Sequence, residues 1–189
     1  MRLLFFAGST REGSYNKKLA RLAQHIATAN GIEGVFVDLK DYPMPLYHGD
    51  LEANEGPPVK AAEFKALLAE YQGVFIATPE YNSSIPALLK NTIDWVSRVQ
   101  DAHETREQVF RERVFAIASA SGGRLGGARA LAALRLILSA CHAQVIPNQF
   151  ALSFADDAYD EMDKLKNSAD SEALKALVRQ LIDISQRMM

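Results

Sequence analysis

The chain has 189 residues, of which 48% are hydrophobic and 23% charged, a composition typical of a globular protein of ordinary domain size. Its formal net charge of −2 gives no general attraction to nucleic acid or to an anionic membrane, and no apolar run approaches the roughly 20 residues of a membrane-spanning helix. Cys141 is the only cysteine, which excludes an internal disulfide, and the four histidines have no metal-ligand spacing. We therefore expect one domain over residues 1–189, in the reducing cytoplasm, without a metal site.

Short apolar runs alternate with segments of helical periodicity along the chain. Nearly continuous apolar runs are typical of strands covered on both faces, and such strands are predicted at 2–7, 34–39, 73–78, 113–119 and 143–147. Apolar residues recur at helical spacing around 19–26, 64–71 and 174–181, and further helices are predicted at 84–98 and 125–141. The helix at 84–98 is expected to have Ser83 or Ser84 as its cap and Pro86 in its first turn.

This alternation predicts an α/β fold, a doubly wound five-stranded parallel sheet with helices on both faces. With five strands and four crossovers, we expect the strand order 2-1-3-4-5. The loops after the strands, GSTREGSYN, TPEYNSS and SASGGRLGG, are longer and more polar than the turns before them. Ligands in open α/β sheets bind outside the carboxyl ends of the strands, where the strand order reverses. The sequence therefore predicts a site between the loops after the first and third strands.

The loop after the first strand is a candidate anion site. Ser9, Thr10, Arg11, Ser14 and Asn16 offer hydroxyl, guanidinium and amide donors, and the helix that begins near Ser14 directs its positive end to the same place. A capped helix start after a turn is the simpler interpretation, but the donors exceed what capping requires. We therefore expect this loop to bind a phosphate group.

Three kinds of phosphate site are disfavoured by the same loop. Its spacing G-x4-G-S lacks the lysine of a triphosphate loop, since Lys17 and Lys18 come one turn too late. It has no G-x-G-x-x-G for a dinucleotide, although Asp38 ends the second strand. A low-molecular-weight phosphatase would need a cysteine nucleophile in the loop. A monophosphate held without metal remains.

The loops after the third and fourth strands offer a different surface. Residues 79–84 (PEYNSS) combine an aromatic side chain with polar groups, which suits a flat heterocycle, and residues 119–123 (SASGG) allow close backbone approach. Taken separately, the first is a turn with a surface tyrosine and the second a flexible loop before a helix. Beside the anion loop, they favour a heterocyclic ligand that carries the phosphate.

Three segments, GSTREGSYNKKLA, TPEYNSSIPALLKNTIDWVSR and SASGGRLGGAR, resemble the signature segments of the NAD(P)H-dependent FMN reductase family, which includes quinone, azo-dye and chromate reductases. The resemblance implies a flavodoxin-like fold, FMN as cofactor and NAD(P)H as cosubstrate. It implies that the residues that hold the FMN phosphate are Ser9, Thr10, Arg11, Ser14, Tyr15 and Asn16. It implies that the residues that border the isoalloxazine are Pro79, Glu80, Tyr81, Asn82, Ser83 and Ser121.

The activity implied is the passage of electrons from NAD(P)H through bound FMN to a small acceptor such as a quinone, azo dye, free flavin or metal oxyanion. Reduction of the flavin needs no side chain as acid or base, so no catalytic residue is named. The alternative is a flavodoxin-type electron carrier without nicotinamide activity, and a third possibility is a flavin-dependent sensor or interaction protein. Carriers tend to be strongly acidic, which a net charge of −2 does not fit.

The resemblance, together with two features of the sequence, indicates a homodimer or homotetramer with the flavin cleft near a second subunit. The helix at 125–141 is apolar on more faces than one sheet contact requires, and residues 41–58 form a long connection after the second strand. The alternative is a monomer whose last helix, 170–188, covers that apolar flank. On the helix at 84–98 we interpret the following side chains as mostly structural, with Trp95 in the core or an interface: Lys90, Asn91, Asp94, Trp95 and Arg98.

Overall fold

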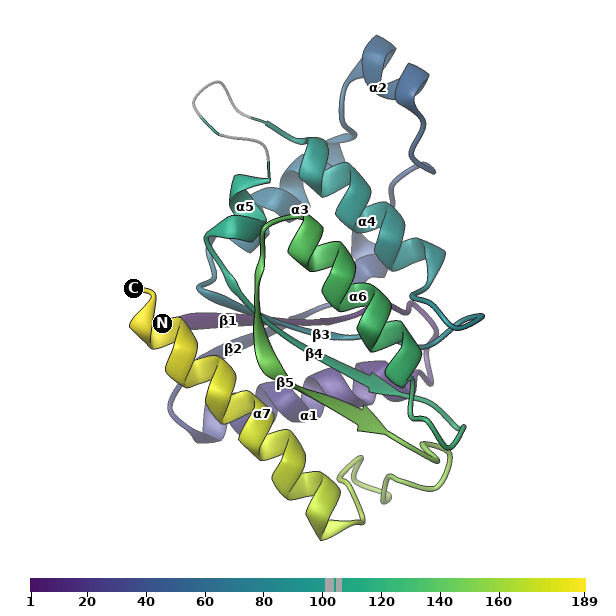
Figure 1. Cartoon of the computed structure of the whole chain (residues 1–189), viewed down its shortest axis with the longest axis vertical. Helices are drawn as coiled ribbons and strands as arrows, with labels where there is room; N and C mark the ends of the chain where they lie inside the picture. The colour runs from purple at the N-terminus through teal and green to yellow at the C-terminus, as the bar shows by residue number, and fades with distance from the viewer. Residues whose placement is uncertain (101–103, 105–106) are drawn as a thin grey trace.

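The computed structural model describes residues 1–100, 104 and 107–189 (Figure 1). Its sheet consists of β1 (Arg2–Ala7), β2 (Glu33–Val37), β3 (Gly73–Ala77), β4 (Val114–Ala120) and β5 (Gln144–Leu152). The strands are all parallel, in the order β2-β1-β3-β4-β5, which confirms the predicted topology. Their carboxyl ends therefore meet at one edge of the sheet, the carboxyl edge, which lies on the right of Figure 1. The opposite edge is the amino edge.

Helices cover both faces of the sheet. One face carries α1 (Tyr15–Ala29) and α7 (Ser168–Arg187), and the other carries α3 (Val59–Ala69), α4 (Ala87–Arg98) and α6 (Ala128–Ala140). Successive residues of a strand point to opposite faces. Leu3 and Phe5 thus belong to the core under α1 and α7, and Leu4 and Phe6 to the core under α3, α4 and α6. Burial on both faces explains the continuous apolar runs of the strands.

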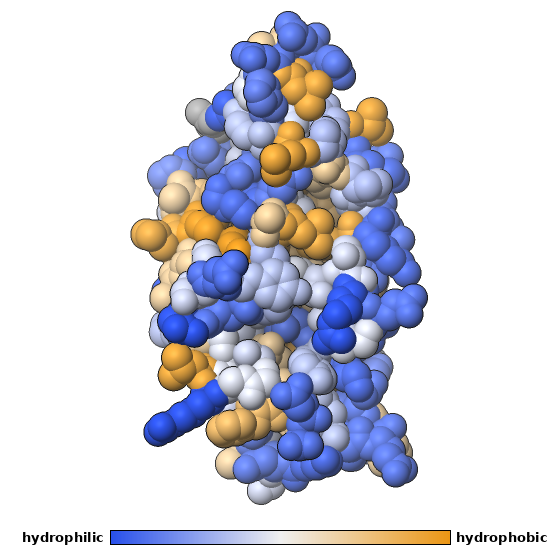
Figure 2. All heavy atoms as spheres, turned by 90° about the vertical axis from the view of Figure 1, so that its right-hand side faces the viewer, coloured by the Kyte–Doolittle hydropathy of each residue, from blue (hydrophilic) through white to orange (hydrophobic). Residues whose placement is uncertain are grey.

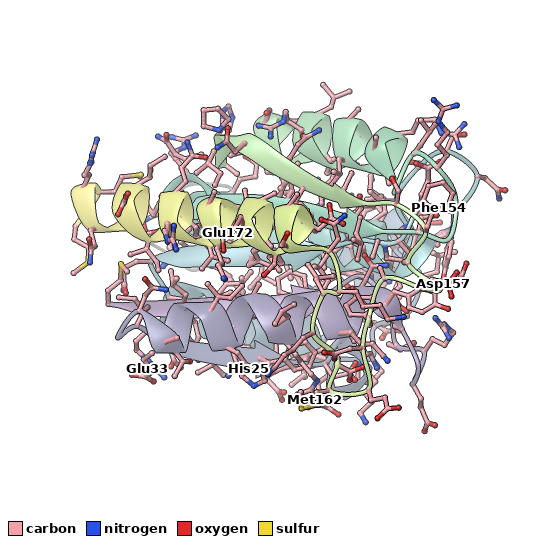
Figure 3. All side chains as sticks on the ribbon, turned by 90° about the horizontal axis from the view of Figure 1, so that it is seen from below. His25, Glu33, Phe154, Asp157, Met162 and Glu172 are labelled. Atoms are coloured by element: carbon pink, nitrogen blue, oxygen red, sulfur yellow. The ribbon has the colours of Figure 1, made fainter. Side chains whose placement is uncertain are left out.

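The last helix lies on the face away from α6. Figures 1 and 3 show α7 beside α1, and its apolar residues pack in the same core as those of α1. The alternative in which the last helix covers the apolar flank of the fourth predicted helix is therefore wrong. Leu136, on the outward flank of α6, is 73% exposed.

The fifth strand is longer than predicted, because β5 continues from Pro147 to Leu152. Proline has no N–H for a sheet ladder and is tolerated in edge strands and at bulges. β5 is an edge strand, and its register against β4 shifts between Phe115 and Ile117, so that Pro147 lies among the extra residues of the irregularity. The proline interrupts the pattern of the sequence without ending the strand.

Two helix starts also differ from the prediction. The helix predicted at 84–98 begins at Ala87, with Pro86 rather than Ser83 or Ser84 at the cap position. The one predicted at 125–141 begins at Ala128, because Gly126 and Gly127 have φ of +60° and +89°, outside the helical region. Three short helices were not predicted: η1 (Leu39–Asp41), α2 (Gly49–Glu55) and α5 (Gln108–Arg111).

The long connection after β2 forms an arm, residues 42–58, which carries α2 to the top of Figure 1. The buried Trp95 of α4 donates its indole N–H to the carbonyl of Pro45 at 2.7 Å. Asn91 accepts the N–H of Tyr47, and Arg98 forms an ion pair with Glu52 at 2.9 Å. Lys90 and Asp94 pair with each other on the exposed side of the helix. These α4 side chains make structural contacts, as interpreted. Three of them, Asn91, Trp95 and Arg98, hold the arm.

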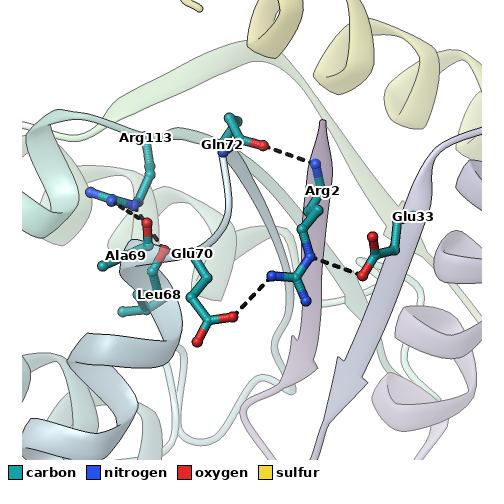
Figure 4. A network of polar contacts seen from close by, with 7 residues as sticks. All are labelled: Arg2, Glu33, Leu68, Ala69, Glu70, Gln72 and Arg113. Atoms are coloured by element: carbon teal, nitrogen blue, oxygen red, sulfur yellow. Dashed lines mark hydrogen bonds and ion pairs between the residues drawn. The ribbon is translucent and has the colours of Figure 1, made fainter.

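Side chains close the amino edge by bonding to neighbouring backbone (Figure 4). The guanidinium of Arg113 donates to the carbonyls of Leu68 and Ala69 at the end of α3, both at 2.8 Å, and to that of Val109 at 2.9 Å. Burial lowers the pKa of Arg113. Nearby, Arg2 forms ion pairs with both Glu33 and Glu70, so the arginines of this edge are bonded to groups of the same chain.

Candidate functional site

An open cleft of about 400 Å³ lies at the carboxyl edge, between the loop after β1 and the start of α4. Pockets that bind small molecules enclose about 300–1,000 Å³. Figure 2 views this side of the molecule, and hydrophobic residues form an interrupted band across its middle. The cleft is lined by Gly8, Ser9, Thr10, Arg11, Tyr81, Pro86, Ala87 and Leu88. It therefore joins the first loop (residues 8–14) with the second loop (residues 78–86).

The first loop starts from a position that only glycine fits without adjustment. The N–H of Gly8 donates to the carbonyl of Ala77 at 2.9 Å, which keeps the chain against β3. A Cβ atom on Gly8 would lie 3.0 Å from Cδ2 of Leu89 on α4. The absence of a side chain thus lets α4 approach the loop, and Ser9, only 6% exposed, follows in the wall of the cleft.

The first loop leads into the N-terminus of α1, where backbone N–H groups and the helix dipole favour an anion. Ser14 is the N-cap and accepts the N–H of Lys17 at 3.4 Å. The first turn of α1 contains no acidic residue that would already neutralise this end. Arg11 is exposed beside the cleft, with its guanidinium carbon 5.4 Å from the centre of the Tyr15 ring. The arrangement can receive a phosphate at the mouth of the cleft.

Lys17 is buried behind the first loop instead of facing a ligand. Its Nζ donates to the carbonyl of Thr10 at 3.0 Å and forms an ion pair with Asp38 at 2.6 Å. Asp38 in turn accepts the N–H of Lys40 as the cap of η1. The lysine that comes too late for a triphosphate thus connects the first loop to the end of β2.

Tyr15 and Asn16 connect the first loop to the segments after β4 and β5. The amide of Asn16 donates to the carbonyl of Ala120 and accepts its N–H, both at 2.9 Å. The hydroxyl of Tyr15 donates to Asp156 at 2.7 Å, and this hydrogen bond raises the pKa of Tyr15. Figure 3 shows the segment of Phe154 and Asp157 at this edge. The side chains of Tyr15 and Asn16, which were expected to hold the phosphate, are therefore bonded within the chain.

The second loop contains a tight turn with a fixed shape. Asn82 and Ser83 have φ of +50° and +66°, and Tyr81 and Ser84 exchange two backbone hydrogen bonds across the turn. Two successive residues with positive φ are typical of a type I′ turn. Pro79 is buried at the base of the loop, whereas the Tyr81 side chain is 53% exposed at the cleft. The turn therefore presents the tyrosine ring and the polar residues after it at the carboxyl edge.

Glu80 ties the second loop to the start of α6. Its carboxylate accepts the N–H groups of Arg129 and Ala130, at 3.1 and 3.4 Å, and pairs with the Arg129 guanidinium at 2.5 Å. Burial raises the pKa of this carboxyl, but the hydrogen bonds from Arg129 and Ala130 outweigh burial, so that the net pKa is lowered. The side chain of Glu80 therefore positions the second loop against α6.

The third loop, residues 121–127, completes this edge. The Ser121 hydroxyl accepts the N–H of Gly123 at 3.3 Å, and the carbonyl of Ser121 accepts the N–H of Ala155. Gly127 is required because a Cβ there would lie 2.7 Å from Cβ of Ser119. The loop therefore packs on the end of β5, with Ser121 partly exposed at the carboxyl edge.

Sequence reasoning did not include the far wall of the cleft, Pro86, Ala87 and Leu88. It assigned them to the first turns of a helix that was expected to begin at residue 84, three residues before α4 begins. The signal available was the Ile-Pro pair, because the residue before a proline avoids helical geometry and marks a probable boundary. The link from Lys17 to Asp38 had no such local signal, because the two residues are 21 positions apart.

Comparison with known proteins identifies the family of the chain. A model of the family described as NADPH-dependent FMN reductase matches residues 1–157. A quinone reductase of Escherichia coli is 36% identical over 146 residues, 77% of this chain and 73% of that protein. An NAD(P)H-dependent FMN reductase of Pseudomonas aeruginosa is 35% identical over 184 residues, 96% of this chain and 91% of that protein.

The fold agrees with the same assignment. The solved structure of FerB, a flavoenzyme NAD(P)H:(acceptor) oxidoreductase from Paracoccus denitrificans, matches with a TM-score of 0.82 and 25% identity, over 99% of this chain and 98% of that one. The family match includes the first, second and third loops and the strands that carry them. The chain belongs to the NADPH-dependent FMN reductase family.

Proposed function

We propose that the cleft at the carboxyl edge binds FMN and that the protein passes electrons from NAD(P)H to a small acceptor of the quinone type. Membership of the family makes the chain an oxidoreductase that uses FMN and NAD(P)H. The observation that carries the assignment to this cleft is the N-terminus of α1, which has no acidic residue in its first turn and opens beside Ser9, Thr10 and Arg11.

The donor set fits a phosphate monoester. Such a group carries about −1.5 to −2 charges at neutral pH and three acceptor oxygens. In the proposed arrangement, the phosphate lies on the first loop, with the guanidinium of Arg11 and the hydroxyls of Ser9, Thr10 and Ser14 as donors. Asn16 and Tyr15 keep the loop against the end of β4 and the segment after β5 through the bonds that they already make.

The second and third loops are proposed to border the flavin ring. FMN, when bound, supplies the redox chemistry, because its ring accepts a hydride from NAD(P)H and gives electrons to the acceptor. The chain supplies orientation: the type I′ turn at Asn82 and Ser83 fixes the backbone that faces the ring, and Glu80 holds that turn against α6. Tyr81 and Ser121 provide an aromatic surface and a hydroxyl at the rim.

A small acceptor is favoured over a protein partner. The cleft is open to solvent, and relatives are named quinone reductases, which supports a quinone. A flavodoxin-type carrier is not favoured, since the family is that of NADPH-dependent reductases and a net charge of −2 offers little attraction for a basic partner protein.

The protein is also proposed to form a homodimer or homotetramer through the outward flank of α6. Leu136 is 73% exposed there, and α7 lies on the opposite face of the sheet. Light scattering behind a size-exclusion column is expected to give a multiple of the chain mass of 20.8 kDa. A mass that stays at one chain at every concentration would rule out the assembly.

The cytoplasm is the proposed location, because the only cysteine, Cys141, is unpaired. Within the described ranges, none of the helices combines the length and the apolar character needed to cross a membrane.

The test of the main proposal is spectroscopic. The purified protein, reconstituted with FMN, is expected to show flavin absorbance bands that bleach when NADPH or NADH is added without oxygen and return when benzoquinone is added. Heat extraction and chromatography should identify the flavin as FMN and not FAD. Bands that persist with both nicotinamides would favour the electron carrier, and the absence of any flavin binding would refute the site.

A further inference from the structure

Lys17 does not line the cleft, and it contacts the first loop on the side away from the cleft. It is 8% exposed, and its Nζ bonds to the carbonyl of Thr10 at 3.0 Å as well as to Asp38 at 2.6 Å. A buried ammonium is costly unless it is paired and its remaining hydrogens are bonded. Asp38 satisfies the charge. The bond to Thr10 is directed at the loop that lines the cleft.

The bond to Thr10 determines which way one peptide group of the loop points. The described peptide bonds are trans, so the carbonyl of Thr10 and the N–H of Arg11 point in opposite directions. Since the carbonyl points to Lys17, behind the loop, the N–H of Arg11 is directed away from it. That N–H meets the hydroxyl of Ser9, which lines the cleft, at the long distance of 3.4 Å. The Arg11 N–H is therefore held in place with a weak acceptor, and it can donate to an anion that approaches more closely.

We propose that Lys17 is a positioning residue for the phosphate of FMN: it keeps the Thr10 carbonyl away from the cleft and so holds the Arg11 N–H toward the anion. This inference rests on the proposed FMN site. Without the anchor, the peptide can turn, and a carbonyl oxygen would then face the phosphate. Lys17 acts through the loop, and it does not itself touch the ligand.

A purely structural role for the Lys17–Asp38 pair is the alternative, and the two roles differ in their dependence on the phosphate. Riboflavin has the ring and ribityl chain of FMN without the phosphate. A residue that orients a phosphate donor affects FMN binding alone, whereas a residue that only supports the fold affects both flavins. The ratio of the two affinities is therefore the quantity to measure.

Three variants are compared with the unaltered full-length protein, each freed of flavin and titrated by flavin fluorescence with FMN and with riboflavin. Lys17→Met removes the anchor and leaves Asp38 unpaired, which can impair folding. Lys17→Met combined with Asp38→Asn removes both charges and still frees the Thr10 carbonyl. Lys18→Met is the matched control, since Lys18 is the next residue of α1 and its ammonium pairs with Asp163, partly exposed and away from the first loop.

The single and double Lys17 variants are expected to bind FMN about tenfold to a hundredfold more weakly, because a hydrogen bond to a charged group is lost. Their affinity for riboflavin is expected to equal that of the unaltered protein. The Lys18 variant is expected to bind both flavins as the unaltered protein does. A double variant with unaltered FMN affinity, or one that loses FMN and riboflavin equally, would overturn the role of Lys17. An unaltered protein that does not prefer FMN to riboflavin would instead refute the phosphate site itself.

Discussion

Each edge of the sheet carries an arginine, and the two arginines differ in what their guanidinium groups contact. At the amino edge, the guanidinium of Arg113 is buried on three backbone carbonyls of the same chain. At the carboxyl edge, the guanidinium of Arg11 is exposed beside the cleft, next to a helix N-terminus without an acidic residue in its first turn. Donors that are bonded within the chain stabilise the fold, whereas donors that face an open cleft are available to a ligand. Stability and binding are therefore expected to respond to different arginines.

The largest effect is expected at Arg113. In Arg113→Met, the carbonyls of Ala69 and Val109 lose their donor, whereas that of Leu68 keeps the N–H of Tyr71, and each buried unsatisfied group costs about 1–3 kcal/mol. We expect the free energy of unfolding to fall by about 3 kcal/mol or more, with FMN affinity unchanged. Urea denaturation measures the difference, and Arg111→Met, at an exposed position two residues earlier, is the control. Equal urea midpoints for the two variants would break the comparison.

Arg11→Ala is expected to give the reverse result. Loss of a charge-assisted hydrogen bond is worth about 1.5–3 kcal/mol, which weakens FMN about tenfold to a hundredfold. Because Arg11 is exposed, the free energy of unfolding of the flavin-free protein should change by no more than about 0.5 kcal/mol. Fluorescence titration and urea denaturation check the two parts. Arg187→Ala, at an exposed position at the end of α7, is the control and should leave FMN affinity and the free energy of unfolding unchanged. Equal FMN affinities for the Arg11 and Arg187 variants would show that Arg11 is not in the site.

Glu80 tests the comparison from the carboxyl edge, because its side chain is bonded within the chain although the residue lies at the proposed site. Glu80→Gln is expected to lower the free energy of unfolding by about 1–2 kcal/mol at neutral pH, since the charged acceptor of the Arg129 guanidinium is lost. The folded protein lowers the pKa of Glu80, so this contribution is present above the ordinary value of 4.5 and is lost as the pH falls below it. The two proteins should therefore converge in acid; a difference that stays constant from pH 7 to about 3 would contradict the role of the charge.

The smallest effect is expected at Arg2, which shares the amino edge with Arg113. Its ion pairs with Glu33 and Glu70 involve side chains that are 39%, 59% and 54% exposed. Exposed pairs contribute little to stability, so Arg2→Met should shift the urea midpoint far less than Arg113→Met does. A loss as large as that of Arg113→Met would show that position at the edge, rather than burial, decides the effect.

Much of the fold could be predicted from local patterns. The strand order follows from five apolar runs, and the position of the site follows from polar loops after each of them, because parallel strands bring those loops to one edge. The arm could not be predicted in the same way. Its helix α2 has no buried residue and hence no apolar stripe, and the arm is held by Asn91, Trp95 and Arg98 of α4, far along the chain.

The candidate site was predictable at the level of loops and less so at the level of side-chain roles. The donors at Ser9, Thr10 and Arg11 line the cleft, as the loop composition indicates. The bonds of Asn16 to Ala120 and of Glu80 to the start of α6 join segments that are 104 and 49 or more residues apart. Such contacts depend on the packing of the sheet, and the sequence of one loop does not predict them.

Trp95 gives the protein a built-in optical probe. It is the only tryptophan, fully buried, with its indole N–H on the carbonyl of Pro45 and the Tyr47 ring 5.0 Å away, centre to centre. Release of the arm would replace these neighbours with water and shift the emission to longer wavelength. A flavin bound in the same chain absorbs where tryptophan emits, so quenching by energy transfer would report cofactor loading. One fluorescence spectrum can thus follow the docking of the arm by its wavelength and the flavin by its intensity.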